Sequence, residues 1–349
     1  MFDLIIIGAG PAGIAAAYEA KKHGLDYLVI EKGLIGNTIY SYPVGLTVFS
    51  TTNELEFEPG GLDPAREKPT REELLSYYVR FVLDNELNVQ TEEKVLTVSS
   101  AHSAGSDGES GNGERDRVFE VVTEKGIYHA KNILFAIGAM DYPRRLGVPG
   151  EDLPKVYDHF RETYPWVKKR ALIVGGGNSA GEAALFLAEE GADTTLAIFR
   201  TDWENDDPKQ GCIKYWVKQP LEDELQKHCL KLFFLGKVLE ITEDAVILEN
   251  ENGAREVLPN DVVFILIGAD ADLTMLKSLG VETTAGGKYG EVPVYDEETF
   301  ETNVTGIYVA GHFTNQRHIK GAIDASKALI PKLAAKLNEK GSASSTGKI

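Results

Sequence analysis

The 349-residue sequence contains only two cysteines, Cys212 and Cys229. Two cysteines are too few for a disulfide framework, and the sequence has no CxxC motif of the kind that serves redox or metal chemistry. No group of histidines and cysteines has the spacing of metal ligands, so no metal site is predicted. The scarcity of cysteine therefore restricts any redox chemistry to a cofactor or to the substrate.

Basic residues are also few, because 36 Lys and Arg face 54 Asp and Glu and leave a net charge of −18. A field of this sign repels nucleic acid and anionic membrane surfaces, so neither is an expected partner. No apolar run approaches the ~18 residues of a membrane span, and the N-terminus lacks the features of a signal peptide. We therefore expect a cytoplasmic protein, and the sparse cysteines agree with this location.

Hydrophobic periodicity indicates a β-α-β unit that occurs twice in the chain. The first copy has an apolar strand at 4–7, a helix at 12–22 and a strand at 27–31. The second copy has a strand at 171–174, a helix at 179–190 and a strand at 194–199. The chain length fits two domains. The sequence thus predicts an α/β protein with two Rossmann-like, doubly wound, three-layer dinucleotide-binding domains.

The first glycine-rich turn, Gly8-Ala9-Gly10-Pro11-Ala12-Gly13, lies between a strand and a helix. In this position Gly8 permits a tight turn, Gly10 lets the backbone approach a pyrophosphate, and Gly13 lets helix and strand pack closely. The helix N-terminus supplies amide donors to the phosphates. Glu31 ends the next strand and is placed to bind the two ribose hydroxyls, which makes the fingerprint specific.

The second turn, Gly175-Gly176-Gly177-Asn178-Ser179-Ala180, has the same context but is followed by Arg200 rather than by an acid. An arginine can pair with a 2′-phosphate, whereas an acid would repel it, so Arg200 favours NADPH over NADH. Lys214 is a second candidate contact. The alternative is that Arg200 is a solvated charge, since Asp202, Glu204, Asp206 and Asp207 crowd the same loop.

Residues 101–116 form a low-complexity segment rich in glycine, serine and charge. Such a composition cannot offset the entropy of ordering, so a flexible insertion between strands at 94–98 and 118–123 is predicted. A binding loop and a tolerated surface insertion are both compatible with it, and the insertion is the favoured interpretation.

The order of further motifs resembles the low-molecular-weight thioredoxin reductase-like flavoproteins over nearly the whole chain. After the first turn come Ile133–Gly138 and Leu146–Gly150, then the second turn, Phe264–Gly268 and Thr302–Gly311. The resemblance implies a discontinuous FAD domain over 1–153 and 288–349, with an NADPH domain over 154–287 inserted. Thioredoxin reductases carry a CxxC just before the second turn, where this sequence has 158–166 without cysteine, which excludes an ordinary thioredoxin reductase.

The segments 39–43 and 48–51 are instead similar to the bacillithiol disulfide reductase (YpdA-like) family. That family usually has a cysteine inside its first glycine motif, where this chain has Ala12, so no thiol can act at that position. His312 is a second departure, because many relatives place an aspartate after the corresponding glycine. His312 either binds through its ring nitrogens or packs.

The resemblance also implies the cofactor contacts and the candidate catalytic residues. The implied FAD-binding residues are Gly8, Gly10, Pro11, Ala12, Gly13, Glu31, Lys32, Ser50, Thr51, Val95, Ala136, Gly138, Gly311, His312, Lys320, Gly321 and Ala322. The implied NADPH-binding residues are Gly175, Gly177, Asn178, Ser179, Ala180, Arg200, Lys214 and Gly268. The catalytic candidates are Tyr40, Tyr42, His318 and Lys320.

These features predict an FAD-containing, NADPH-dependent oxidoreductase that reduces a low-molecular-weight thiol disulfide such as bacillithiol disulfide. The resemblance also implies a homodimer or larger homo-oligomer. Two alternatives stay open: an NADPH-dependent reductase of a small redox protein such as ferredoxin or flavodoxin, and a flavin-binding redox sensor without turnover.

Overall fold

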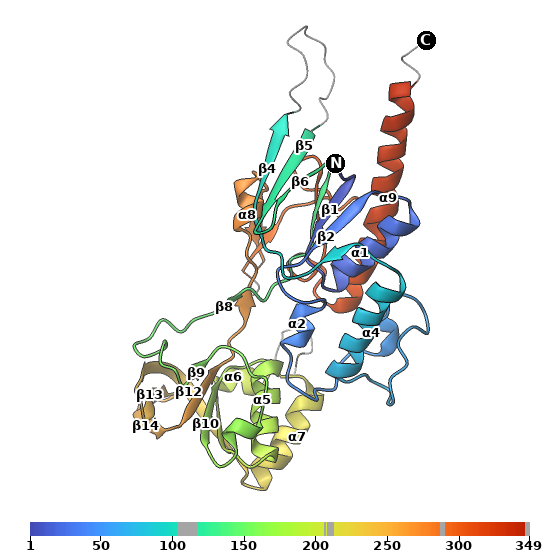
Figure 1. Ribbon diagram of the computed structural model, residues 1–349. Coiled ribbons are helices and arrows are strands. Elements are labelled where there is room, and N and C mark those ends of the chain that lie inside the picture. Colours follow the sequence, from blue (N-terminus) through green and yellow to red (C-terminus); the bar gives the residue numbers. More distant parts are fainter. Residues whose placement is uncertain (103–116, 206, 208–212, 287–289, 346–349) are drawn as a thin grey trace. The chain divides into compact units, whose positions relative to one another are not determined.

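The computed structural model describes residues 1–102, 117–205, 207, 213–286 and 290–345 (Figure 1). The chain divides into two compact units, and the second is inserted into the first. The first unit comprises Met1–Ser41, Gly45–Asp141 and Asp270–Ile349, and the second comprises Tyr42–Val44 and Tyr142–Ala269.

The discontinuous division was expected, but its boundaries were not placed correctly. The inserted unit begins at Tyr142 rather than at residue 154 and ends at Ala269 rather than at 287. Residues 142–153 pack with the inserted unit and residues 270–286 with the first unit. The expected insertion at 101–116 also starts later, because strand β4 (Val95–His102) continues to His102, and residues 103–116 lie outside the described residues.

The first unit is built on a five-stranded parallel sheet in the order β19-β7-β1-β2-β3. Its strands are β1 (Leu4–Ile7), β2 (Tyr27–Ile30), β3 (Val89–Gln90), β7 (Ile133–Phe135) and β19 (Ile307–Val309). All four residues of β1 are buried, which explains its unbroken apolar run, since a central parallel strand is covered on both faces.

Two helices of the first unit lie side by side next to this sheet, α1 (Pro11–Lys22) and α9 (Ile319–Ser345) (Figure 1). The alanine-rich face of α1 is fully buried, and its small side chains allow the close approach of α9. The unit's other helices are α2 (Asn37–Tyr40), α3 (Thr52–Leu55), α4 (Arg71–Asp84) and α8 (Thr274–Ser278).

A three-stranded antiparallel sheet covers the other face and completes three layers. It consists of β4, β5 (Arg117–Thr123) and β6 (Ile127–Ala130), with Phe119 and Val121 in one core with the first sheet. The hairpin of β17 (Thr283–Ala285) and β18 (Glu291–Pro293) belongs to the same unit.

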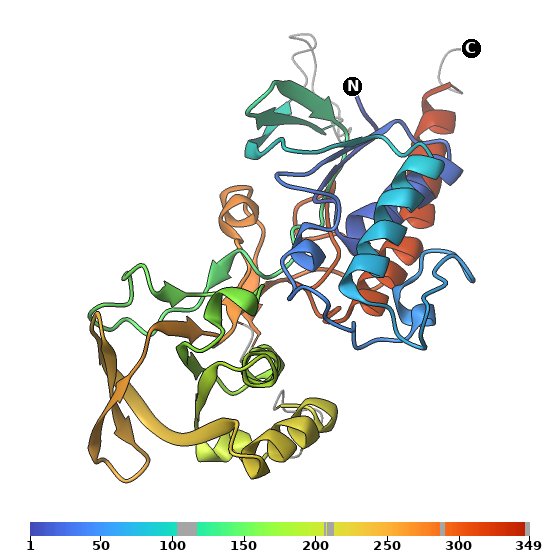
Figure 2. The same ribbon diagram turned by 60° about the horizontal axis from the view of Figure 1, so that its bottom comes forward.

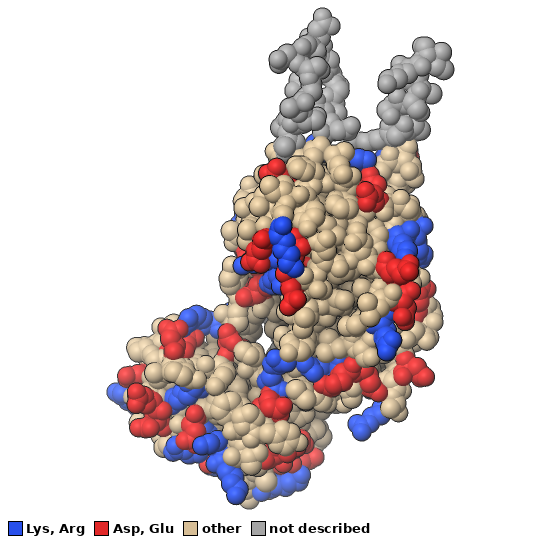
Figure 3. All heavy atoms as spheres, in the orientation of Figure 1, with Lys and Arg blue, Asp and Glu red and all other residues tan. Residues whose placement is uncertain are grey.

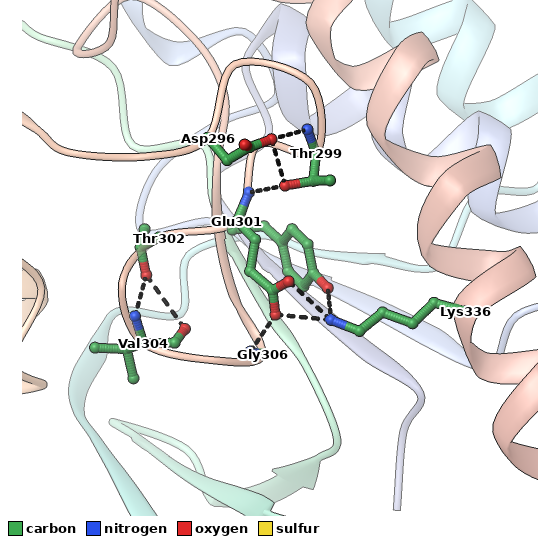
Figure 4. Close-up of polar contacts among 8 residues, drawn as sticks. Asp296, Thr299, Glu301, Thr302, Val304, Gly306 and Lys336 are labelled. Atoms are coloured by element: carbon green, nitrogen blue, oxygen red, sulfur yellow. Dashed lines mark hydrogen bonds and ion pairs between the residues drawn. The ribbon is translucent and has the colours of Figure 1, made fainter.

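A polar cluster ties α9 to the loop before β19 (Figure 4). Lys336 Nζ contacts both carboxylate oxygens of Glu301 at 2.9 and 2.8 Å and the hydroxyl of Tyr308 at 3.2 Å. Glu301 also accepts a hydrogen bond from the Gly306 N–H at 2.8 Å. Burial raises the pKa of Tyr308 to about 12, so its hydroxyl is protonated at neutral pH. The cluster fixes the end of β19 relative to α9.

The second unit has a seven-stranded mixed sheet in the order β14-β13-β12-β11-β10-β15-β9. Its strands are β9 (Val156–Tyr157), β10 (Arg170–Val174), β11 (Asp193–Ile198), β12 (Leu230–Ile241), β13 (Ala245–Asn250), β14 (Arg255–Pro259) and β15 (Val262–Ile265). The long β12 pairs in parallel with β11 and then antiparallel with β13.

Two helices of this unit, α5 (Asn178–Glu189) and α7 (Tyr215–Gln226), pack on one face of the sheet, away from the β13–β14 hairpin (Figures 1 and 2). The short elements are α6 (Arg200–Trp203), the 3-10 turn Tyr164–Trp166, and the strands β8 (Tyr142–Pro143) and β16 (Ala269–Asp270), which pair where the chain passes between the units. The fold is thus the expected pair of Rossmann-like domains.

Candidate nucleotide-binding sites

The first candidate site lies at the carboxyl edge of the parallel sheet in the first unit. Strand β1 stands between β2 and β7, and the connections from it leave in opposite directions. Ala136 donates a backbone hydrogen bond to Ile7 at 2.8 Å, and Ala310 donates one to Phe135 at 3.0 Å. The carboxyl ends of β1, β7 and β19 therefore lie at the same level. Open α/β sheets bind ligands in the crevice outside such strand ends.

The glycines of the first turn have different neighbours. A Cβ at Gly13 would overlap the carbonyl oxygen of Gly8, and one at Gly8 would lie 2.5 Å from the carbonyl oxygen of Ala136. A Cβ at Gly10 would meet no protein atom within 4 Å. Gly8 and Gly13 are thus required by the protein's own packing, whereas Gly10 borders open space at the N-terminus of α1. A pyrophosphate fits that space, where the helix amides and dipole favour an anion.

Glu31 is buried and joins the first turn to the segment after β2. One carboxylate oxygen accepts from the Ala9 N–H at 2.8 Å and the other from the Gly33 N–H at 2.7 Å. Each oxygen has two acceptor positions, so the carboxylate can also bind ribose hydroxyls. The structure therefore brings together the predicted residues of the first turn and Glu31.

Helix α9 contributes to the same edge through Ser326, which sequence reasoning missed. The Ser326 hydroxyl is fully buried and donates to the carbonyl oxygen of Ala12 at 2.8 Å. A Cβ at Gly311 would lie 3.4 Å from that of Ala12, so the predicted residues Ala12 and Gly311 are adjacent. No motif marks a serine inside an amphipathic helix, and only the packing of α9 on α1 reveals it.

Other predicted FAD residues have partners within the protein. Lys32 pairs with Asp141, Thr51 caps α3 together with Glu54, and Val95 lies in the hydrophobic core. Lys320 pairs with Asp324 at 3.0 Å. Lys320 also lines a pocket with Asn53 and Glu54 of α3, and α3 contacts α9.

The remaining FAD residues flank the strand ends or the start of α9. Gly138 has a φ of +77°, Gly321 packs against the side chain of Gln316, and Ala322 is buried. The pKa of His312 is lowered by desolvation and by the charges of Arg317 and His318, which favours a neutral imidazole. Ser50 lies in the bend before α3, and Pro11 is the first residue of α1.

The catalytic candidates are divided between the two units. Tyr40 ends α2, and its carbonyl oxygen accepts from the guanidinium of Arg71. Tyr42 belongs to the second unit, where burial and the carboxylate of Glu182 raise its pKa. His318 and Lys320 lie at the start of α9 in the first unit. Within either unit, the candidates form no single cluster.

The second candidate site repeats the first at the carboxyl edge of β10, which stands between β11 and β15. A Cβ at Gly175 would overlap the carbonyl oxygen of Leu266, just as a Cβ at Gly8 would overlap that of Ala136. A Cβ at Gly177 would meet no protein atom within 4 Å, which makes it the counterpart of Gly10. A second pyrophosphate therefore fits at the N-terminus of α5.

The other predicted NADPH residues surround this turn. Asn178 accepts a hydrogen bond from the Lys214 N–H at 2.8 Å and so holds the N-terminus of α7 beside that of α5. Ala180 is buried, Ser179 lies in the first turn of α5, and the Gly268 carbonyl oxygen accepts from the Arg144 N–H at 2.9 Å. The carboxylate of Asp202, one of the acids that the sequence places near Arg200, packs against Gly176.

The side chain of Arg200 has three partners within the protein, which the sequence did not predict. Its Nε and Nη2 donate to the two oxygens of Glu251 at 2.6 and 2.5 Å, and Nη1 donates to Glu204 at 3.3 Å. The guanidinium lies 3.7 Å from the centre of the Phe234 ring. Arg200 is thus an exposed charge at the start of α6, 43% accessible, that pairs with two carboxylates and lies over one ring.

The described residues contain one cysteine and no cluster of metal ligands. Cys229 is a free, exposed cysteine, and Cys212 lies outside those residues. Within the described ranges no three metal-ligating side chains gather into a site. In that same part of the chain, no helix has the length and apolarity that a membrane crossing needs.

The pyridine nucleotide-disulphide oxidoreductase model matches residues 5–311 of this chain and spans both turns. The chain belongs to this family. The bacilliredoxin reductase Bdr of Bacillus subtilis is 34% identical over 307 residues, which cover 88% of each chain. A ferredoxin–NADP reductase of Ignicoccus hospitalis is 30% identical over 320 residues, with 90% of each chain covered.

Solved structures agree with the sequence relatives. The bacillithiol disulfide reductase Bdr (YpdA) of Staphylococcus aureus has a TM-score of 0.84 and 33% identity, covering 96% of this chain and 98% of that one. A thioredoxin reductase of T. acidophilum has a TM-score of 0.70 at 22% identity and supports the fold alone, covering 96% and 98%. The expected resemblance is thus confirmed, and the chain is a flavin-dependent enzyme of the disulfide reductase type.

Proposed function

We propose that this protein holds FAD at the first turn and NADPH at the second, and reduces a low-molecular-weight thiol disulfide of the bacillithiol type. The observation that carries the assignment is the pair of open positions at Gly10 and Gly177, each above a helix N-terminus and beside a required glycine. Two such cradles in one chain fit two dinucleotides, and the relatives are reductases of the same architecture.

The residues of the first unit would divide the binding of FAD among them. The amides at the start of α1 would bind the pyrophosphate, and Glu31 would bind ribose hydroxyls with the acceptor positions that Ala9 and Gly33 leave free. The N-terminal amides of α9, together with Lys320, would stabilise negative charge at the flavin ring. When bound, FAD supplies the electron transfer between the nicotinamide and the disulfide.

The disulfide would be reduced without a protein thiol at the glycine motif, because position 12 is alanine. In the overall reaction NADPH and a proton convert one disulfide to two thiols and NADP⁺. A neutral imidazole is the ring form that can accept a proton, and the lowered pKa of His312 keeps it in that form. The reaction consumes a proton, which a neutral His312 cannot supply, so His318 is the candidate for delivering it.

The relatives act, by their names, on two kinds of acceptor. The Bacillus subtilis relative is named for bacilliredoxin and the Staphylococcus aureus structure for bacillithiol disulfide, whereas the Ignicoccus hospitalis relative is named for ferredoxin. The net charge of −18 disfavours docking of an acidic ferredoxin. On the face drawn in Figure 3, acidic and basic side chains are interspersed on both units. A small disulfide is therefore the favoured acceptor, and a ferredoxin-type protein is the second candidate.

Rapid mixing of the FAD-loaded protein with NADPH under argon tests the proposal. We expect loss of flavin absorbance, followed by reoxidation on addition of bacillithiol disulfide faster than by oxygen. Reduction by NADPH with reoxidation only by ferredoxin or flavodoxin would select the second candidate. Absence of flavin reduction by both NADPH and NADH would leave the redox sensor.

We further propose that the enzyme works in the cytoplasm as a homo-oligomer, as its sparse cysteines and its resemblance suggest. Its partners would then be the small disulfide or a small redox protein, without nucleic acid or membrane. Light scattering of the purified protein measures the oligomeric state directly.

A further inference from the structure

The guanidinium of Arg200 already uses three of its five N–H groups on carboxylates. Each of its three nitrogens donates to a carboxylate: Nε and Nη2 to Glu251, and Nη1 to Glu204. The ion pair raises the pKa of Arg200 and lowers that of Glu251, chiefly through the hydrogen bonds between the two side chains. A phosphate that pairs with Arg200 must therefore share or displace these partners.

Glu251 is held in place by the backbone as well as by Arg200. It directly follows β13, and its N–H donates to the carbonyl oxygen of Phe234 at 3.0 Å. The Phe234 ring in turn supports the guanidinium at 3.7 Å. The side chain of Glu251 is 29% exposed, against 61% for Glu204. Glu251 is thus the more buried partner of Arg200 and makes two hydrogen bonds to it, whereas Glu204 is more exposed and makes one.

The charges around Arg200 oppose a second anion. One guanidinium and two carboxylates sum to a formal charge of −1, whereas a 2′-phosphate is close to a dianion at neutral pH. Arg200 would attract a bound phosphate at hydrogen-bond distance. The carboxylates of Glu251 and Glu204, only a few ångströms further from the phosphate, would repel it, because Coulomb energy falls only as the inverse of distance. Removal of one carboxylate would make this cluster neutral and leave Arg200 free to pair bidentately with a phosphate.

We propose that Glu251 is a specificity-determining residue that competes with the 2′-phosphate of NADPH for Arg200 and so limits the preference for NADPH over NADH. The proposal rests on the proposed function, because it assigns the second turn to a nicotinamide nucleotide. It differs from the simple expectation for Arg200, in which an arginine at this position is sufficient for selectivity.

Calorimetric titration of the FAD-loaded protein with NADP⁺ and NAD⁺ tests the proposal by binding, independently of turnover. Glu251→Gln is expected to tighten NADP⁺ about tenfold and to change NAD⁺ less than twofold. Glu204→Gln should shift NADP⁺ in the same direction by a smaller factor. Steady-state kcat/KM values for NADPH and NADH should change in the same ratio as the dissociation constants.

Glu249→Gln is the matched control, since Glu249 lies two residues before Glu251, within β13, but pairs with Lys237 at 3.3 Å. It removes the same charge and should leave both affinities within twofold. An unchanged NADP⁺/NAD⁺ ratio in Glu251→Gln, or a weaker binding of NADP⁺, would overturn the proposal. If wild type binds neither nucleotide, the proposed function itself fails, which is a distinct outcome.

Discussion

The two nucleotide turns share one geometry and differ in the residue that closes them. In the first, Glu31 points into the turn and accepts N–H groups of Ala9 and Gly33. In the second, Arg200 lies over Phe234 and is held by Glu251 and Glu204. In the first turn the acid therefore binds the backbone of its own unit and keeps acceptor positions for the ribose of the proposed FAD. In the second, the residue at this place is a cation that already pairs with two carboxylates.

The helices that follow the turns differ at two equivalent positions. The first turn ends in Gly13, which touches the backbone of Gly8, whereas the second has Ala180 at the matching place. Two residues further along, α1 has the buried Ala15 and α5 has Glu182. Burial raises the pKa of Glu182 to about 7. The second helix therefore carries a titratable group where the first has only a methyl.

The largest effect is expected from Gly13→Ala, compared with Ala180→Gly. A Cβ at position 13 overlaps the Gly8 backbone, which cannot move away without opening the turn. We expect Gly13→Ala to lower the free energy of unfolding by at least about 3 kcal/mol and to lose flavin. Ala180→Gly should cost only about 1 kcal/mol, mainly through helix propensity. Equal denaturation midpoints for the two variants would show that the turns are packed alike.

Arg200→Gln should have the next largest effect, on nucleotide selectivity rather than on folding. Loss of the charge is expected to raise KM for NADPH about tenfold or more and to leave KM for NADH within twofold. Steady-state kinetics with both nucleotides measure the two values. Equal increases in both would mean that Arg200 does not contact a 2′-phosphate.

Glu182 should produce a smaller, pH-dependent effect that is confined to the second unit. Its pKa is about 7 in the folded protein and near the ordinary 4.5 when unfolded, so the folded state binds the extra proton. Stability is therefore expected to fall as pH rises from about 4.5 to 7, by on the order of 1–3 kcal/mol, and then to level off. Denaturation of wild type and Glu182→Gln across this range separates the contribution, because the variant should lack this component. A pH dependence identical in both proteins would contradict the assignment to Glu182.

The fold and the turns could be predicted from the sequence because their signals are local. A strand of four apolar residues, a glycine pattern and an alanine-rich helix specify a β-α-β unit without information from elsewhere. The boundaries of the units could not be placed in this way. They depend on which unit residues 142–153 and 270–286 pack against, and this packing is a long-range property that no local pattern marks.

The parts of the site that were missed depend on long-range pairing. Ser326 reaches Ala12 across 314 positions of sequence, and Glu251 reaches Arg200 across 51. Neither residue belongs to a pattern that marks it, since a helix serine and an acid in a turn are common. Sequence reasoning could name Arg200, but the partner that limits its action is visible only once β12 and β13 are paired.

The most direct test of the two-cofactor account uses the glycines that border open space. Ala at position 10 or 177 would meet no protein atom within 4 Å, so neither variant should change the denaturation midpoint appreciably. We predict that Gly10→Ala purifies with little FAD. Gly177→Ala should retain FAD and bind NADP⁺ at least tenfold more weakly than wild type. Full flavin content in Gly10→Ala together with unchanged NADP⁺ binding in Gly177→Ala would contradict the account.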